Sequence, residues 1–229
     1  MSTAKKVLIF KHSRAWSNDR CSTLLEAKGY QIDWCYPMEG EPLPDPRQYS
    51  AAVMFGSRDS VNDPEPWIKN ELNWLEDCLK ANCPFLGICF GGQLLAKVLG
   101  ARVAKHAESL TEIGFTDILP RKQTEASFAS PLKLFQWHRE GFDLPSDTKL
   151  LCSSERYPNQ AFRYQDAAYG LQFHPEVNHD IIKKWFSGND DYESEGLDPA
   201  SRNRQLEYAR LNDDTITEWF SGFIDNWLN

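Results

Sequence analysis

The first hundred residues alternate between short apolar runs and longer amphipathic segments. The apolar runs are bounded by turn-forming residues and predict buried strands; they are Lys6–Phe10, Gln31–Tyr36, Ala51–Phe55 and Phe85–Ile88. The segments between them have apolar residues at helical spacing and predict helices; they are Ser17–Lys28, Pro64–Lys80 and Phe90–Leu99. Strands that alternate with helices indicate a mainly parallel sheet with helices on both faces.

The pattern changes after Gly100. Arg102–Leu119 and Lys149–Phe173 are rich in strand-forming residues separated by turns, which predicts that the sheet gains antiparallel strands. From Asn178 the spacing becomes helical again, which predicts a helical C-terminal extension over about residues 178–229. Since there is no internal repeat and no long linker, we expect residues 1–229 to form a single domain.

Two features of this C-terminal segment have structural interpretations. An apolar stripe is expected to pack on its own domain rather than bind a partner; it consists of Trp219, Phe220, Phe223 and Trp227. The acidic stretch Asn189–Asp198 is expected to be a solvated loop.

Charge and cysteine content exclude several classes of protein. The net charge is −8 and no basic run stands out, so nucleic acid is not an expected partner. The N-terminal apolar run, Val7–Phe10, is too short for a signal peptide, and no run is long enough to cross a membrane. The six cysteines form no C-x-x-C pair. We therefore expect a cytoplasmic protein with reduced cysteines and no membrane partner.

The segment PFLGICFGGQLLAKVLG places Cys89 at the junction of a predicted strand and a predicted helix. Gly87 and Gly91 lie two residues away on each side and would let strand and helix pass closely, as in a nucleophile elbow. The helix N-terminus favours a thiolate there. Cys89 is therefore a candidate nucleophile, and a buried structural cysteine is the alternative.

A candidate base follows the apolar run AAYGLQF. Pro175 favours extended backbone at His174, and residues two apart in an extended chain face the same way. Glu176 could therefore orient the imidazole of His174, as in a catalytic triad. The alternative is a strand-end histidine beside a solvated glutamate. The spacing does not match H-E-x-x-H, so no metal site is expected.

Together, GICFGGQ and GLQFHPE, about 85 residues apart in this chain, resemble the two motifs of class I glutamine amidotransferases. The subgroup is the one similar to the amidotransferase domain of GMP synthase. The resemblance implies a flavodoxin-like three-layer α/β/α sandwich, with a mostly parallel central sheet and added antiparallel strands. It also implies a triad of Cys89, His174 and Glu176 that hydrolyses the side-chain amide of glutamine through a γ-glutamyl thioester.

The resemblance further implies an oxyanion hole. Phe90 matches the residue whose backbone N–H binds the oxyanion, and Gly56 matches the loop that supplies the second N–H. The loop departs from the family pattern, since Phe55-Gly56-Ser57 stands where two glycines and a proline are common. In many ammonia-supplying members this loop is mispositioned until a synthetase binds.

Substrate contacts are expected from two further residues. Gln93 matches a glutamine that contacts the substrate, and His138 lies in FQWHREGFDLP, which resembles a histidine-glycine-aspartate segment of the subgroup. Arg139 and Glu140 replace the glycine and the aspartate. This change could alter specificity, because the segment is expected to hold the substrate's α-carboxylate and α-amino groups.

Three functions are compatible with these motifs. The first is a glutaminase that feeds ammonia to a synthetase on a separate polypeptide, and the second is a free-standing γ-glutamyl hydrolase or peptidase with the same triad. Neither requires a metal or an organic cofactor. The third is a non-catalytic regulatory or binding protein, against which the intact set of Cys89, His174 and Glu176 argues.

Overall fold

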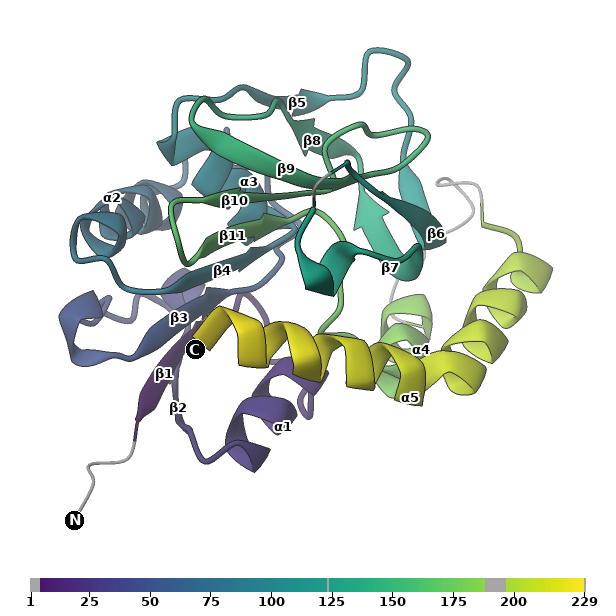
Figure 1. Ribbon diagram of the computed structural model, residues 1–229, viewed down its shortest axis with the longest axis horizontal. Helices are drawn as coiled ribbons and strands as arrows, with labels where there is room; N and C mark the ends of the chain where they lie inside the picture. The colour runs from purple at the N-terminus through teal and green to yellow at the C-terminus, as the bar shows by residue number, and fades with distance from the viewer. Residues whose placement is uncertain (1–4, 123, 188–196, 229) are drawn as a thin grey trace.

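The computed structural model describes residues 5–122, 124–187 and 197–228. Within these residues, the main sheet has nine strands in the order β2-β1-β3-β4-β11-β10-β9-β6-β7 (Figure 1). Its strands are β1 (Lys6–Phe10), β2 (Gln31–Cys35), β3 (Ala51–Met54), β4 (Phe85–Ile88), β6 (Glu112–Pro120), β7 (Leu132–His138), β9 (Thr148–Ser153), β10 (Ala161–Tyr164) and β11 (Ala168–Leu171). A separate antiparallel pair joins β5 (Val103–Lys105) to β8 (Glu140–Phe142).

Strand β11 connects the two halves of the sheet. It pairs in parallel with β4, with Gly170 beside Gly87 and Leu171 beside Ile88. From β10 to β7 every neighbouring pair is antiparallel. The predicted antiparallel addition is therefore confirmed. Because β4 and β11 run side by side in the same direction, the residues that follow each strand emerge at the same edge.

Five helices cover the two faces of the sheet in the described part of the chain (Figure 1). They are α1 (Arg20–Ala27), α2 (Pro66–Lys80), α3 (Phe90–Val98), α4 (His179–Ser187) and α5 (Pro199–Leu228). Alternate residues of β1 point to opposite faces: Val7 packs in the core with α1, α4 and α5, whereas Leu8 packs in the core with α2 and α3. The chain has the flavodoxin-like three-layer α/β/α fold, as predicted.

Several predicted boundaries were off by one to three residues. Helix α1 starts at Arg20 rather than Ser17, because the Asp19 side chain accepts a hydrogen bond from the Ser22 N–H and caps the helix. Helix α2 starts at Pro66, where proline suits the first helical position. Short 3₁₀ turns occur at Pro37–Glu39, Pro46–Gln48 and Ala126–Phe128.

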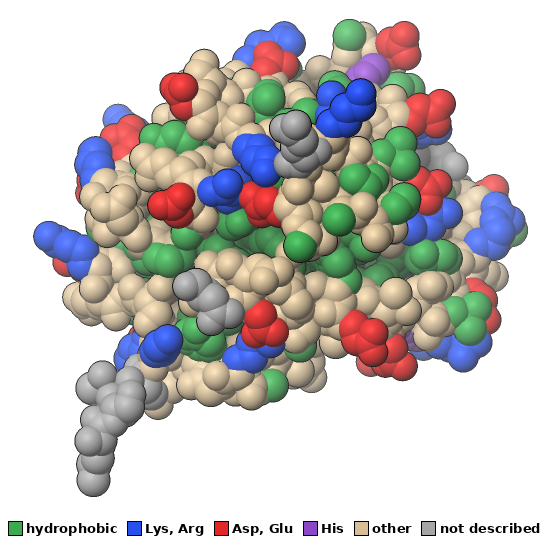
Figure 2. Space-filling view, in the orientation of Figure 1, with side chains coloured by type: hydrophobic (Ala, Val, Ile, Leu, Met, Phe, Trp, Pro, Cys, Tyr) green, Lys and Arg blue, Asp and Glu red, His purple; other side chains and the backbone are tan. Residues whose placement is uncertain are grey.

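The apolar stripe of α5 packs on its own chain, as predicted. Phe220, Phe223 and Trp227 are buried, and the Trp227 indole donates a hydrogen bond to the Ala167 carbonyl at 2.9 Å. Figure 2 shows hydrophobic side chains in a band across the middle of this view, with acidic and basic side chains interspersed around it. None of the described helices is long and apolar enough to span a membrane. Most of the predicted acidic loop, residues 189–196, lies outside the described residues.

Candidate active site

Cys89 lies at a sharp turn between β4 and α3. Its φ of 52° and ψ of −103° are unusual for a residue with a side chain, and such backbone costs about 1–3 kcal/mol. The Cys89 N–H donates to the Leu171 carbonyl at 2.7 Å, and the Cys89 carbonyl accepts from the Gln93 N–H at 2.9 Å. The turn is therefore anchored to β11 on one side and to the first turn of α3 on the other.

Three glycines make this turn sterically possible. A Cβ on Gly87 would lie 2.3 Å from the Gly91 carbonyl oxygen, and a Cβ on Gly91 would lie 2.2 Å from that of Met54. A Cβ on Gly92 would lie 2.5 Å from the Leu171 carbonyl oxygen. All three neighbours are backbone atoms, which cannot rotate away. The structure therefore supports the steric reason for the glycines beside Cys89 and adds Gly92 to them.

The sulfur of Cys89 lies near polar groups of Gln172 and Trp137. The Gln172 amide donates to Sγ at 3.7 Å, and the Trp137 carbonyl oxygen lies 4.0 Å from Sγ. Cys89 is 5% exposed, and it lines a cavity together with His174 and Gly56. The thiol is thus shielded from bulk solvent but reaches a space that a substrate could enter.

His174 and Glu176 form a buried pair beside this cavity. The imidazole Nδ1 and the carboxylate Oε1 are 2.7 Å apart, and Nε2 has no hydrogen-bond partner among the described residues. Burial lowers the pKa of His174, but the carboxylate of Glu176 and the sulfur of Cys89 outweigh it and raise the pKa to about 10. The imidazolium is therefore the favoured form at neutral pH, and its Nε2 proton is available.

Arg20 supports the segment that carries Glu176. Its backbone N–H donates to the Glu176 carbonyl at 2.7 Å. Its side-chain Nη1 donates to the carbonyls of Pro175 and Val177 at 2.5 and 2.6 Å. Its other nitrogens bind α5: Nη2 contacts Asp213 at 2.6 Å, and Nε donates to the Thr217 hydroxyl at 2.8 Å. One residue thus connects the C-terminal helix to three successive carbonyls around Glu176.

The two residues expected at the oxyanion hole lie beside Cys89. Phe90 begins α3, so its backbone N–H is one of the donors that the first helical turn leaves unpaired. Gly56 packs against the site so closely that an added Cβ would lie 2.9 Å from His174 Cε1 and 3.6 Å from Cys89 Cβ. Their donation to an oxyanion stays a prediction, but both are close to the candidate nucleophile.

Gln93 and His138 also line the cavity, and both bind the segment that includes Glu140. The Gln93 amide donates to the Glu140 carbonyl at 2.9 Å, and His138 Nδ1 is 2.9 Å from the same carbonyl oxygen. His138 Nε2 is 3.2 Å from Glu112 Oε2. Both side chains therefore hold the protein's own backbone, and their direct contact with a substrate stays a prediction.

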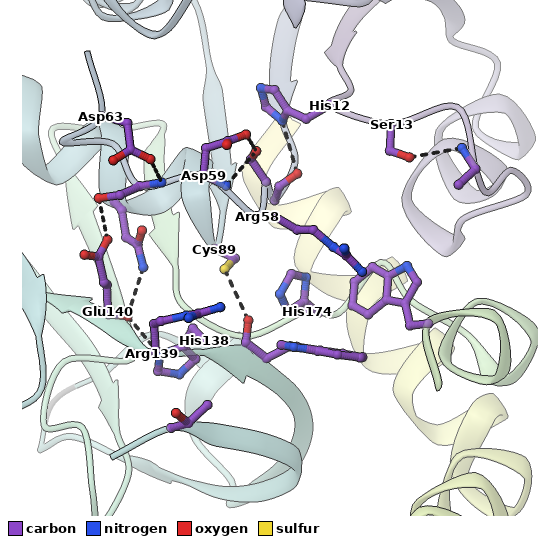
Figure 3. Close-up of a pocket in the computed structure, with 18 of the residues that line it drawn as sticks. His12, Ser13, Arg58, Asp59, Asp63, Cys89, His138, Arg139, Glu140 and His174 are labelled. Carbon is purple, nitrogen blue, oxygen red and sulfur yellow. Dashed lines mark hydrogen bonds between the residues drawn. The ribbon is translucent and has the colours of Figure 1, made fainter. Parts of the chain in front are cut away.

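The cavity has a volume of about 1210 Å³, above the ~300–1,000 Å³ typical of small-molecule sites. Figure 3 shows Cys89 between His174 and the segment of His138, Arg139 and Glu140. Glu140 Oε2 accepts a hydrogen bond from the Ser60 hydroxyl at 2.7 Å, which ties this segment to the loop after β3. Among the described residues, no group of three or more His, Cys, Asp or Glu side chains is arranged to hold a metal ion.

Sequence reasoning missed several polar residues of the site. Glu71 offered a signal, because it falls on the same helical face as Ile68 and Leu75, where a charge is unexpected, and the structure buries it. His12 offered another, because it follows the carboxyl end of β1, where sites form in parallel sheets. The role of Arg20 has no such signal, since its partners lie about 155 to 197 residues further along the chain.

Comparison with known proteins identifies the class to which this fold and cavity belong. The family described as "Glutamine amidotransferase class-I" matches residues 40–186. The match covers more than half of the chain, and the chain therefore belongs to the class I glutamine amidotransferase family.

Individual relatives show how far this similarity extends. A glutamine amidotransferase from Thermotoga maritima superimposes with a TM-score of 0.90 at 30% identity and 99% coverage of both chains. Gamma-glutamyl peptidase 4 of Arabidopsis thaliana is 29% identical over 70% of this chain and 67% of its own length. A glutamine-hydrolyzing GMP synthase subunit from Pyrococcus abyssi is 34% identical over 46% of this chain and 57% of its own length.

Proposed function

We propose that this protein is a cysteine amidohydrolase that cleaves the side-chain amide of glutamine and releases ammonia. The observation that carries the proposal is the arrangement of Cys89 at a glycine-lined elbow, on the same cavity as the buried His174–Glu176 pair. Family membership supports the reaction class. The direct test is release of ammonia and glutamate by the purified chain.

In the first half of the proposed reaction, the Cys89 thiolate attacks the δ-carbonyl carbon of glutamine and a C–S bond forms. The carbonyl electrons move to oxygen, and the N–H groups of Phe90 and the Gly56 loop bind the resulting oxyanion. When the intermediate collapses, the C–N bond breaks and the Nε2 proton of His174 goes to the departing nitrogen. Ammonia leaves, and a γ-glutamyl thioester remains on Cys89.

In the second half, neutral His174 takes a proton from water, and the water oxygen attacks the thioester carbonyl. The C–S bond then breaks, which regenerates the Cys89 thiolate beside the His174 imidazolium. The product γ-carboxylic acid loses its proton to solvent. Glu176 stabilises the imidazolium in both resting and regenerated states, consistent with its 2.7 Å contact to Nδ1.

Glu176→Gln is expected to reduce kcat less than His174→Ala does, so that the Glu176→Gln variant keeps a kcat about a hundredfold higher. The reason is that it misorients the base without removing it. It should also lower the pKa of His174, since the carboxylate is the strongest influence that raises it. The imidazolium would then deprotonate at a lower pH. Steady-state kinetics and an NMR titration of the His174 Cε1 proton measure both effects. Equal losses in kcat would mean that Glu176 does more than orient His174 and stabilise its imidazolium.

A second candidate function is a free-standing γ-glutamyl hydrolase, in which a larger amine replaces ammonia as the leaving group. The cavity volume favours it, because glutamine alone would leave much of the space empty. A relative named as a gamma-glutamyl peptidase supports it, whereas the relative named as part of a GMP synthase supports ammonia supply to a separate synthetase.

Tryptophans surround the side of the cavity on which a leaving group would lie. The leaving nitrogen must be near His174, which supplies its proton. The Trp185 ring packs edge-on against the His174 ring, with 5.2 Å between the ring centroids. Its centroid is also 5.4 Å from that of Trp137 and 6.1 Å from that of Trp16. All three tryptophans line the cavity together with Lys184. This wall suits a bulky amine that carries a carboxylate, such as an aromatic amino acid.

If the protein is a γ-glutamyl hydrolase, γ-glutamyl-phenylalanine should be cleaved with a kcat/KM at least about fivefold higher than that of glutamine, since one aromatic contact contributes about 1 kcal/mol. Trp185→Ala should remove this preference and leave glutamine turnover within about threefold. Trp34→Ala is the matched control, because Trp34 is exposed on β2 and does not line the cavity. Turnover of glutamine alone would favour the ammonia-supplying function, and an equal loss on both substrates would show that Trp185 only supports His174.

A further inference from the structure

His12, which follows strand β1, connects the Gly56 loop to helix α2, and neither His12 nor α2 takes part in the proposed reaction. Its Nδ1 is 3.1 Å from the Gly56 carbonyl oxygen, and its Nε2 is 3.0 Å from Glu71 Oε1 on helix α2. The two side chains are 1% and 0% exposed. Figure 3 shows His12 above the cavity, with its hydrogen bond directed to the loop after β3.

The partners of His12 determine where its protons are. A carbonyl oxygen only accepts, so Nδ1 must carry a hydrogen and donate it to Gly56. Nε2 faces a carboxyl group, and the two share a proton that resides either on the imidazole or on Glu71. In both cases the Nδ1–H of His12 is fixed, and its bond to Gly56 is strengthened by the pair behind it.

The pair is costly to bury, which argues for a role other than general stability. Glu71 Oε2 has no hydrogen-bond partner within the described part of the chain. A buried ion pair seldom stabilises a fold more than apolar side chains of similar size would. The ring is also held in place by aromatic neighbours, with Trp67 at 5.2 Å and Phe90 at 5.0 Å. His12 thus touches both residues expected at the oxyanion hole, Gly56 and Phe90.

Because the peptide bond is planar, the hydrogen bond from His12 to the Gly56 carbonyl also determines where the next N–H points. In a trans peptide, the C=O and N–H point in opposite directions, so the peptide from Gly56 to Ser57 can present either its oxygen or its N–H to a given side. The hydrogen bond from His12 to the Gly56 oxygen fixes which of the two groups faces His12 and which faces the opposite side. A rotated peptide would lose this hydrogen bond and would leave the buried His12 donor unsatisfied, at a cost of about 1–3 kcal/mol.

We propose that His12 and Glu71 are positioning residues that lock the Gly56–Ser57 peptide with its N–H available to the oxyanion, so that the hole is formed before substrate or partner binds. The inference rests on the proposed cysteine hydrolase mechanism. It assigns no contact with substrate to His12 or Glu71, whose effect passes through the loop.

Two substitutions of His12 separate its two hydrogen bonds. In His12→Asn the side-chain amide nitrogen takes the place of Nδ1 and can still donate to Gly56, whereas in His12→Gln it takes the place of Nε2 and cannot. Both His12 variants are made in a chain that also carries Glu71→Gln, so that neither variant leaves a buried carboxylate unpaired. The chain with Glu71→Gln alone is the reference.

The kinetics are measured with glutamine and γ-glutamyl-phenylalanine as substrates. His12→Gln should lower kcat about a hundredfold, the effect of losing one oxyanion donor. His12→Asn should stay within about fivefold of the reference, and KM should change little in either.

A reaction that forms no oxyanion distinguishes positioning from general damage. Alkylation of Cys89 by iodoacetamide needs the thiolate but not the hole, so its rate should be the same in both variants. Equal kcat in His12→Asn and His12→Gln would overturn the proposal, as would an alkylation rate that falls in parallel with kcat.

Hydrogen exchange gives a reading that does not depend on turnover. Peptides covering residues 55–61 should exchange faster in His12→Gln than in His12→Asn, and equal exchange would contradict the lock. If the unsubstituted chain hydrolyses no substrate but the exchange difference is present, the proposed function fails and the positioning role remains.

Discussion

Replacing Cys89 by alanine is expected to abolish hydrolysis of glutamine and of γ-glutamyl amides, with a loss in kcat of at least about 10⁴-fold. The substitution removes the atom that forms the thioester in the proposed mechanism. Ammonia release, measured by a coupled assay, and glutamate release are the readouts. The fold should persist, since alanine fits within the volume of cysteine.

The matched control for this experiment is Cys35→Ala. Cys35 is another free, buried cysteine, on β2, and burial raises the pKa of its thiol to about 12. It does not line the cavity, so its loss should leave kcat within about twofold. Comparable turnover by Cys89→Ala and the unsubstituted chain would refute the nucleophile assignment. No turnover by the unsubstituted chain on any substrate would instead support the non-catalytic function.

The second large effect is expected from Gly91→Ala, which should prevent formation of the native elbow. The new Cβ would lie 2.2 Å from the Met54 carbonyl oxygen and 3.0 Å from the Met54 Cβ. Relief requires α3 to move away from β3, which is a change in the packing of the buried centre. We expect a loss of stability of about 3 kcal/mol or more, comparable with the larger overpacking effects, and loss of activity in whatever folds.

Gly222→Ala is its matched control, because the same substitution in α5 meets no atom within 4 Å. Alanine in a helix interior stabilises by about 0.5–1 kcal/mol relative to glycine. Urea unfolding monitored by tryptophan fluorescence gives both free energies of unfolding. A Gly91→Ala chain as stable as the control would mean that the elbow tolerates a side chain and that its glycines are not sterically required.

The parts of the site that are local in sequence could be predicted. Cys89 with Gly87 and Gly91 defines the elbow within five residues, and the spacing of His174 and Glu176 predicts their contact through the alternation of an extended chain. The order of strands and helices up to residue 100 likewise follows from periodicity, because each element shows its own pattern.

The contacts that depend on tertiary pairing could not be predicted from residue patterns. The pairing of β11 with β4 brings His174 to Cys89, but no local pattern specifies which strand neighbours which; only the family resemblance implied that the two residues meet. His12, Glu71 and Gly56 come from three different elements, so their hydrogen bonds depend on how these elements pack. The starts of α1 and α2 were missed because a cap and a proline decided them rather than apolar spacing.

The Arg20 bridge has a consequence for the order in which the protein becomes functional during synthesis. Arg20 and the carbonyls beside Glu176 are made before Asp213 and Thr217, the residues of α5 that complete its contacts. A nascent chain in which Cys89, His174 and Glu176 have already been synthesised thus still lacks two hydrogen-bond partners of Arg20, the residue that supports the segment of Glu176. The support behind Glu176 is complete only after α5 has left the ribosome and docked.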